Sequence, residues 1–288
     1  MNFKKSHKCF FVSDLHGKAE RYEKLIKEIK NFTPDLVFIG GDIYPPFNII
    51  TEHFTEGFFE GFFIKLFRKL KTEMEDKYPD IFIILGNDDP KPEEQFFIEA
   101  GKEKLWQYIH NKKTGFKDYD IYGFSFIPPT PFLYKDWELY DISRYVDPGC
   151  IHPTEGKRHV KPDFDIEFTT IKQQLEELTK DNNLEKSIFL FHSPPYKTNL
   201  DRAALDGIHY DHVPLDVHVG SIAIKDFIEK RTPYISLHGH IHESTRLTGF
   251  WKEKINKTWC FNAAIDTSEL SVIVFNLENP QDAERRVL

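Results

Sequence analysis

The chain has 288 residues, 40% of them hydrophobic, so it can bury one substantial core, and we expect a single domain, residues 1–288, with insertions. Its formal net charge of −8 offers no basic surface to a long polyanion, so a nucleic-acid partner is not expected. No apolar run approaches the roughly 20 residues of a membrane span, and the N-terminal run is too short for the core of a signal peptide. The three widely spaced cysteines fit neither a disulfide framework nor a thiolate zinc site, which favours a cytoplasmic protein.

Five short apolar runs predict the strands of a sheet that is covered on both faces. They are Cys9 to Ser13, Leu36 to Gly40, Ile81 to Leu85, Ile188 to Phe191 and Tyr234 to Leu237. Between the first two runs, residues 18–31 carry apolar side chains at helical spacing, which predicts a strand, helix, strand unit with parallel strands. In such sheets ligands gather beyond the carboxyl ends of the strands.

Residues 47–78 form a segment dense in phenylalanine, with apolar side chains at spacings of three and four from Phe54 to Leu70. We expect a helical insertion here. The pattern is typical of a long amphipathic helix packed on the core, and a lid or a dimer surface is the alternative.

Residues 124–162 are rich in proline and aromatic residues, and we expect an irregular insertion that walls the functional site. A helical pattern resumes from Asp163 to Asp181. The last part of the chain is expected to form a second sheet or a sheet edge. Its short strands are predicted at Thr245 to Gly249, Thr258 to Asn262 and Leu270 to Asn276.

A short polar motif directly follows each of the five apolar runs. The motifs are Asp14-Leu15-His16, Gly41-Asp42, Gly86-Asn87, His192 and Gly239-His240-Ile241-His242. Each of the first four motifs alone is more typical of a turn, a cap or a strand end than of a ligand, and the pair His240 and His242 is more indicative. Together they offer carboxylate, imidazole and amide groups, which divalent metals accept. The series therefore predicts a two-metal site, whereas His238 is expected to be structural or to support a ligand.

This ordered series resembles the calcineurin-like metallophosphoesterase superfamily, whose pattern is D-x-H, G-D, G-N-H-[DE], H and G-H-x-H. The resemblance extends from Asp14 to His242. The segments around His192, Asp201 and His218 look most like the small prokaryotic phosphoesterases of that superfamily. The resemblance implies an α/β fold in which two mixed sheets form a sandwich flanked by helices, in the four layers α/β/β/α.

The resemblance also implies two divalent metal ions, for which manganese, iron and zinc are the candidates. Asp14, His16 and His242 would hold one ion. Asn87, His192 and His240 would hold the other, and Asp42 would bridge the two. Two cations about 3.5–4 Å apart turn a shared water into hydroxide, which attacks the phosphorus in line with the leaving oxygen.

One position departs from the family pattern, because Asp88 stands where relatives carry a histidine beside the leaving group. A general acid contributes roughly 10²–10⁴-fold to rate, so this contribution is missing or comes from another residue. Asp88 could supply the proton if its pKa were raised. His218, His209 and His212 are the substitutes, and His218 is favoured because its segment resembles the family.

Other residues are expected to support the site. Asp89 and Glu243 are candidates for accepting hydrogen bonds from ligating imidazoles, although salt-bridge or capping roles suit them equally. The metal motifs contain no arginine, so a phosphate clamp would come from elsewhere, with Lys135, Arg202 and Arg246 as candidates.

The sequence thus predicts a dinuclear metal-dependent phosphoesterase acting on a small phosphodiester or phosphomonoester, with Asp88 and His218 as candidate catalytic residues. The departure at Asp88 favours phosphodiesters with good leaving groups. A protein-binding scaffold that keeps this fold with little or no catalysis is the alternative. No membrane partner is expected, and a homo-oligomer stays open.

Overall fold

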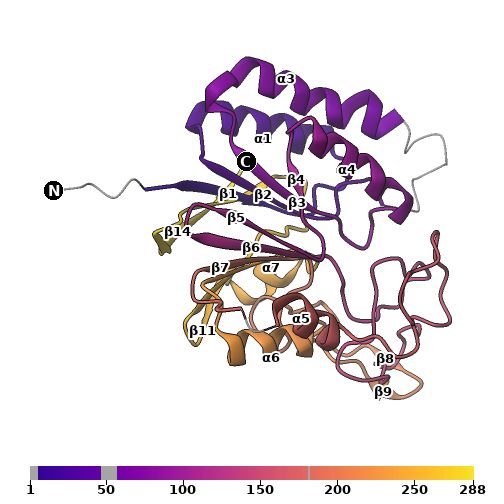
Figure 1. Ribbon diagram of the computed structural model, residues 1–288. Helices are drawn as coiled ribbons and strands as arrows, with labels where there is room; N and C mark the ends of the chain where they lie inside the picture. Colours follow the sequence, from indigo (N-terminus) through magenta and orange to yellow (C-terminus); the bar gives the residue numbers. More distant parts are fainter. Residues whose placement is uncertain (1–5, 47–56, 181) are drawn as a thin grey trace.

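The computed structural model describes residues 6–46, 57–180 and 182–288. Two six-stranded sheets lie face to face, and helices cover the outer face of each sheet (Figure 1). The predicted α/β/β/α sandwich is therefore confirmed. None of the described helices has the length and hydrophobicity that crossing a membrane requires.

The first sheet has the strand order β14-β13-β1-β2-β3-β4. Neighbouring strands from β1 to β4 run parallel, whereas β13 runs antiparallel to β1 and β14 antiparallel to β13. The strands are β1 (Lys8–Val12), β2 (Leu36–Gly40), β3 (Asp80–Ile84), β4 (Gln107–Tyr108), β13 (Ser271–Asn276) and β14 (Asn279–Val287).

The second sheet has the order β11-β12-β10-β7-β6-β5. Its four inner strands are parallel and its two edge strands are antiparallel to their neighbours. The strands are β5 (Lys112–Phe116), β6 (Tyr119–Phe124), β7 (Ser187–Phe191), β10 (Ile235–His238), β11 (Lys252–Ile255) and β12 (Thr258–Asn262). A separate hairpin pairs β8 (His209–Tyr210) with β9 (Val213–Pro214).

Helices α1, α3 and α4 cover the first sheet, and α5 and α6 cover the second (Figure 1). The helices are α1 (Ala19–Phe32), η1 (Phe59–Phe63, a π-helix), α3 (Ile64–Met74), η2 (Glu75–Lys77), η3 (Lys91–Glu93), α4 (Glu94–Lys102), α5 (Ile171–Thr179), α6 (Ile222–Arg231) and α7 (Ser244–Thr248).

The strands are apolar along their whole length because each has two covered faces. On β1, Phe11 belongs to the cluster between the sheets together with Leu190 and Leu237 of the second sheet. Its neighbour Phe10 points the other way, into the cluster that includes Leu25 of α1. Alternating side chains therefore build the layer between the sheets and the layers under the helices.

The phenylalanine-rich segment is helical from residue 57 onward, and residues 47–56 of that prediction lie outside the described residues. Phe59, Phe63 and Phe67 are buried and pack against Trp106. This face is covered by the core, as the amphipathic-helix interpretation expects, so these three rings leave no free surface for a lid or a dimer.

Two predicted elements differ from the structure. Residues 245–249 were expected as a strand, but residues 245–248 belong to the short helix α7, and Gly249 caps that helix with a positive φ of 80°. The helix expected from Asp163 begins only at Ile171. There a capping box forms between Thr170 and Gln173, which satisfies backbone N–H groups at the first turn.

Residues 125–162 form no helix or extended strand pairing, and their strand-like pairings are isolated bridges such as Ile127 to Glu138. Inside this irregular segment, buried Lys135 pairs with buried Glu138 at 2.6 Å. The Trp137 indole donates a hydrogen bond of 2.7 Å to the Asp89 carbonyl oxygen. The segment is therefore anchored to the loop after β3.

Candidate metal centre

The predicted ligands meet where the carboxyl ends of five parallel strands converge. Asp14 and His16 follow β1, Asp42 follows β2, and Asn87 follows β3 of the first sheet. From the second sheet, His192 follows β7, and His240 and His242 follow β10. Face-to-face packing of the sheets brings the two sets of loops together.

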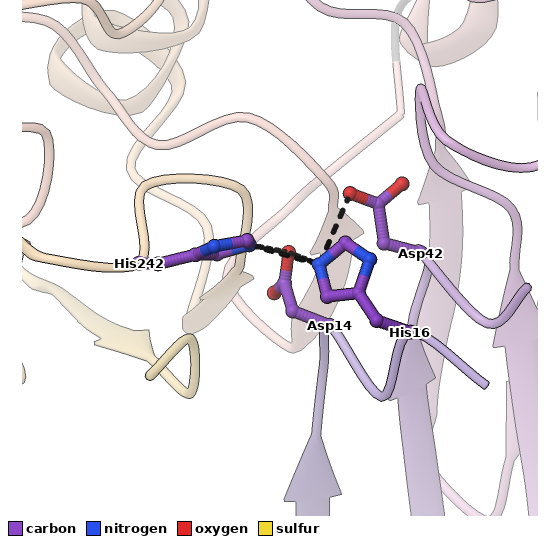
Figure 2. Close-up of side chains that lie close together, drawn as sticks. All are labelled: Asp14, His16, Asp42 and His242. Atoms are coloured by element: carbon purple, nitrogen blue, oxygen red, sulfur yellow. Dashed lines mark hydrogen bonds and ion pairs between the residues drawn. The ribbon is translucent and has the colours of Figure 1, made fainter. Parts of the chain in front are cut away.

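One group of donors consists of Asp14, His16, Asp42 and His242, whose ligand atoms lie within 4.8 Å of one another (Figure 2). Nε2 of His16 lies 3.0 Å from Nε2 of His242 and 3.8 Å from the Asp42 carboxylate. Nε2 of His242 lies 3.1 Å from Oδ1 of Asp14. Nitrogens and oxygens that turn toward a common point suit a divalent cation.

A second group consists of Asp42, His192 and His240, also within 4.8 Å. Nε2 of His192 lies 3.3 Å from Oδ2 of Asp42 and 3.0 Å from Oδ1 of Asn87. The other ring nitrogen, Nδ1, lies 2.8 Å from the Gly40 carbonyl oxygen, so this carbonyl accepts its proton and leaves Nε2 available as a ligand. Asp42 belongs to both groups.

The backbone of four of these residues lies in the left-handed region, at φ 58° for Asp14, 49° for His16, 51° for Asp42 and 71° for His240. Residues other than glycine rarely adopt it, and strained residues of this kind cluster at functional sites. The sharp turns they make direct side chains from strand ends toward one centre.

Two glycines leave room for the carboxylates. A Cβ atom at Gly86 would overlap the carboxylate of Asp42, and a Cβ atom at Gly239 would overlap that of Asp14. A larger residue at either place would displace a candidate ligand, which gives a physical reason for glycine in these two motifs.

Buried carboxylates and imidazoles shift one another's pKa values at the metal centre. Burial alone would raise the pKa of Asp14, but the hydrogen bond with His242 and the nearby imidazoles hold it below its usual range. Burial opposes the charged form of His192, yet the Asp42 carboxylate raises its pKa to about 10. Burial and the neighbouring His192 lower the pKa of His240 to about 3. The carboxylates are therefore ready to bind cations, and the donor set fits divalent metal.

Asp88, which stands where the family pattern has a histidine, lies beside the candidate metal ligands. Its backbone N–H donates to Oδ1 of Asp42 at 2.8 Å, and its carboxylate lies 3.5 Å from Nδ1 of His16. Burial and the charge of Asp42 raise the pKa of Asp88 to about 7.

His218 lines the cavity into which the metal centre opens, and its Nδ1 lies 2.8 Å from the buried carboxylate of Asp201. Asp201 also accepts hydrogen bonds from the backbone N–H groups of Lys197, Thr198 and Gly220. These contacts fix the imidazole ring. The alternatives His209 and His212 are exposed on the β8–β9 hairpin and do not line the cavity.

The centre opens into a cavity of about 620 Å³, which we call the insertion pocket. The Pro-rich segment supplies much of its wall, as expected. Asp141 of that segment binds the Ser221 hydroxyl and two backbone N–H groups at the start of α6. The lining residues are Asp42, 87–88, 128–132, 141–143, 145–150, Tyr196, Ala203, Leu205, 215–216, 218–220, Ile222 and 240–243.

Asp89 and Glu243 were candidates for accepting hydrogen bonds from ligating imidazoles, and both have other partners. The Asp89 carboxylate accepts hydrogen bonds from the backbone N–H groups of Ile43, Tyr44 and Gly86 rather than from an imidazole. Glu243 lines the pocket but accepts its hydrogen bond from the Ala204 N–H.

The three candidates for a phosphate clamp all have other partners. Lys135 pairs with Glu138, Arg202 with Asp206 and Arg246 with Asp266, and none of the three lines the pocket. No clamp from these side chains reaches the pocket in this arrangement.

Sequence reasoning missed Arg21 of α1, which is buried and donates to the backbone carbonyl oxygens of Asp14 and Thr267. An arginine in an amphipathic helix gives no local sign of such a contact. His238 is buried as expected, and its ring nitrogens contact the Ser193 carbonyl oxygen and the Ser236 hydroxyl. It therefore has a structural role behind the centre.

Comparisons with known proteins identify the family of the chain and find its fold in solved structures. The model of the calcineurin-like phosphoesterase family matches residues 7–244. One solved structure is 16% identical with a TM-score of 0.61, covering 98% of this chain and 99% of the other. The protein TT1561 of Thermus thermophilus is 17% identical with a TM-score of 0.57, over 98% and 99% of the two chains.

A dimetal phosphatase from Danio rerio is 8% identical with a TM-score of 0.51, and the match covers 94% of this chain and 95% of that chain. No curated protein matches the sequence. At these identities the structural likeness shows the fold alone. The family match spans most of the sequence and contains every predicted ligand, and the chain therefore belongs to the calcineurin-like phosphoesterase family.

Proposed function

We propose that the protein is a dinuclear metal-dependent phosphoesterase that hydrolyses a small phosphodiester or phosphomonoester. The observation that carries this proposal is the position of Asp42, whose carboxylate belongs to two groups of donors at once. A carboxylate shared by two groups of carboxylate and imidazole donors suits a pair of neighbouring divalent ions. Manganese, iron and zinc are the candidates, and we place the reaction in the cytoplasm.

In this proposal Asp14, His16 and His242 would hold one ion, Asn87, His192 and His240 would hold the other, and Asp42 would serve both. Bound metal would neutralise charge on the phosphoryl group and activate water for attack. Backbone groups hold two of these ligands in position. The Gly40 carbonyl oxygen fixes the His192 ring, and the Asp88 N–H orients the Asp42 carboxylate.

The leaving oxygen needs a proton, and two groups of the pocket are candidates for supplying it. Asp88 lies against the donors, and its raised pKa of about 7 favours the protonated form at mildly acidic pH. His218 is held by Asp201 through Nδ1, which directs its other nitrogen away from that contact. Either side chain would act as general acid.

The test is hydrolysis of bis(p-nitrophenyl) phosphate by protein reconstituted separately with manganese, iron or zinc. Asp42→Asn is the key variant. It should lower both the metal stoichiometry, measured by elemental analysis, and kcat/KM by at least about 100-fold. Asp118→Asn is the matched control, because that carboxylate is 85% exposed and lies outside the pocket.

A protein-binding scaffold is the alternative from another class. It would bind metal and fold normally, yet hydrolyse no ester. Equal inactivity of the wild type and Asp42→Asn with every metal would reject the enzyme proposal and favour the scaffold.

A further inference from the structure

The insertion pocket is much larger than the group that reacts. Its volume of about 620 Å³ lies in the range of ligand sites, and of its lining residues only Asp42, Asn87, His240 and His242, at what we call its inner end, are candidate metal ligands. A phosphoryl group at that end leaves most of the cavity to the rest of the substrate.

The walls around this remaining space are largely apolar. Val146, Leu205, Leu215 and Val219 line it between the Pro-rich segment and the loops beside the β8–β9 hairpin. Further out, Phe132, Ile142 and Tyr145 are 55%, 44% and 69% exposed and also line the pocket. Apolar side chains that stay in contact with water gain free energy when a ligand covers them.

Carboxylates supply the charge on the wall beyond the metal centre. Within the described residues no lysine or arginine lines the pocket, while the carboxylates of Asp141, Asp147, Asp216 and Glu243 do. Nearby basic groups face other partners, as Arg144 does with Glu167 and Arg202 with Asp206. A second anionic group on the substrate would meet like charge with no cation to balance it.

Most of these carboxylates already have hydrogen-bond partners. Asp141 accepts a hydrogen bond from the Ser221 hydroxyl at the start of α6, and Glu243 accepts one from the Ala204 N–H. Asp216 accepts hydrogen bonds from the Tyr196 hydroxyl and the backbone N–H of His218. They repel anions, and a cationic group that paired directly with them would have to compete with the N–H and O–H donors already bonded to their oxygens, whereas the apolar side chains need no such exchange. An uncharged substituent is therefore the best complement to the wall.

We propose that the substrate is a monoanionic phosphodiester whose second substituent is a bulky, uncharged apolar group that fills the insertion pocket. This inference rests on the proposed function, because it takes the inner end of the pocket as the phosphoryl site. It excludes nucleotides with phosphoanhydrides and other substrates that carry a second anionic group.

Binding of nonhydrolysable phosphinates, which have two P–C bonds and no ester bond, to the metal-loaded protein tests the inference without relying on turnover. Titration calorimetry would compare methyl(octyl)phosphinate with dimethylphosphinate, and with methyl(octyl)phosphinates whose octyl chain ends in a carboxylate or a trimethylammonium group. We expect the octyl compound to bind at least about tenfold more tightly than the methyl compound. Both charged chain ends should lose most of this gain.

A double variant tests whether the apolar wall causes the difference in affinity between the octyl and methyl compounds. Leu205→Ser combined with Leu215→Ser should reduce the octyl-to-methyl affinity ratio at least about fivefold. Leu247→Ser is the control, because Leu247 is similarly apolar but lies outside the pocket, and it should leave the ratio unchanged.

Equal affinity for the octyl and methyl compounds would overturn the inference, and so would tighter binding of either charged chain. Tight octyl binding without hydrolysis of any matching p-nitrophenyl ester would instead uphold the ligand class and reject the proposed function. The two failures are therefore distinguishable.

Discussion

The indole N–H of Trp137 and the backbone carbonyl oxygen of Asp89 form a buried hydrogen bond of 2.7 Å. It joins the Pro-rich segment to the loop that carries Asn87 and Asp88. Trp137→Phe keeps the aromatic ring but leaves this carbonyl without its partner. We expect a loss of about 1–3 kcal/mol in the free energy of unfolding, measured in urea.

Trp251→Phe is the matched control for this change. Trp251 is partly buried and packs against Phe261, and its indole N–H has no hydrogen bond among the described residues. If both variants lost the same stability, ring size rather than the Asp89 contact would explain the effect.

Asp89 should matter for both folding and metal binding. Its carboxylate joins the Ile43–Tyr44 backbone to Gly86, so it sets the spacing between the loops of Asp42 and Asn87. Asp89→Ala leaves three buried N–H groups without an acceptor, and we expect several kcal/mol of destabilisation and about 10–100-fold weaker metal binding. Asp89→Asn keeps the oxygen facing Ile43 and Tyr44, so it should fall between Ala and the wild type. Alanine-like behaviour of Asn would contradict this.

Metal should stabilise the folded state. The donors converge only after folding, because five strands from two sheets supply them, so the unfolded chain offers no comparable site. At a metal concentration about 100 times Kd the gain is about 2.7 kcal/mol, and a chelator should remove it. Thermal melts with and without manganese or zinc would measure this shift. An unchanged Tm in every metal would argue against the centre.

Asp88 can be tested by changing the leaving group. If its carboxyl group protonates the leaving oxygen, Asp88→Asn should slow hydrolysis of an alkyl phosphodiester by roughly 10²–10⁴-fold. A p-nitrophenolate leaves without a proton, so the same variant should affect p-nitrophenyl esters far less. His218→Gln, assayed on the same two esters, shows which residue carries this selective loss. Equal losses on both esters would assign neither residue the role.

Stability should depend on the protonation of His110. Burial, and then the charges of Lys91 and Lys112, hold its pKa well below 6.5, and its Nδ1 accepts the Ser125 N–H at 3.0 Å. The unfolded chain binds a proton near pH 6.5 and the folded chain does not. This contribution is therefore full above that pH and is lost as the pH falls.

The size of the effect follows from the linkage relation. Between pH 7.5 and 5.5 the wild type should lose about 1.4 kcal/mol more than His110→Asn, which keeps an acceptor for Ser125 but does not titrate. Urea unfolding of both proteins at each pH measures the difference, and other titrating groups cancel in the comparison. Parallel pH profiles would refute the assignment.

The order of strands and polar motifs was readable from the sequence, because each strand is apolar on both faces and each motif stands at its carboxyl end. The strand prediction for residues 245–249 was wrong because five residues are too few to separate a short strand from one helical turn. The start of α5 at Ile171 is fixed by the capping box at Thr170. The irregular residues before Thr170 have apolar side chains at the same spacing as the helix, so the sequence pattern did not show where the helix begins.

Support of the site was harder to predict than the donors. The donors lie within short motifs, whereas Asp89, Asp141 and Arg21 act through partners far along the chain or through backbone groups. Such contacts depend on how the loops pack and have no local signature. The acidic wall of the insertion pocket likewise comes from separate segments that only the fold brings together.

The left-handed backbone at Asp14, His16, Asp42 and His240 has a consequence for variation in this protein. Glycine adopts these conformations with less strain, so a glycine substitution at one of these positions should make the metal-free protein more stable. Any screen that rewards thermal tolerance without metal would then enrich variants that have lost the centre. Stabilised versions of this protein should therefore be selected with metal present, or with these four positions held fixed.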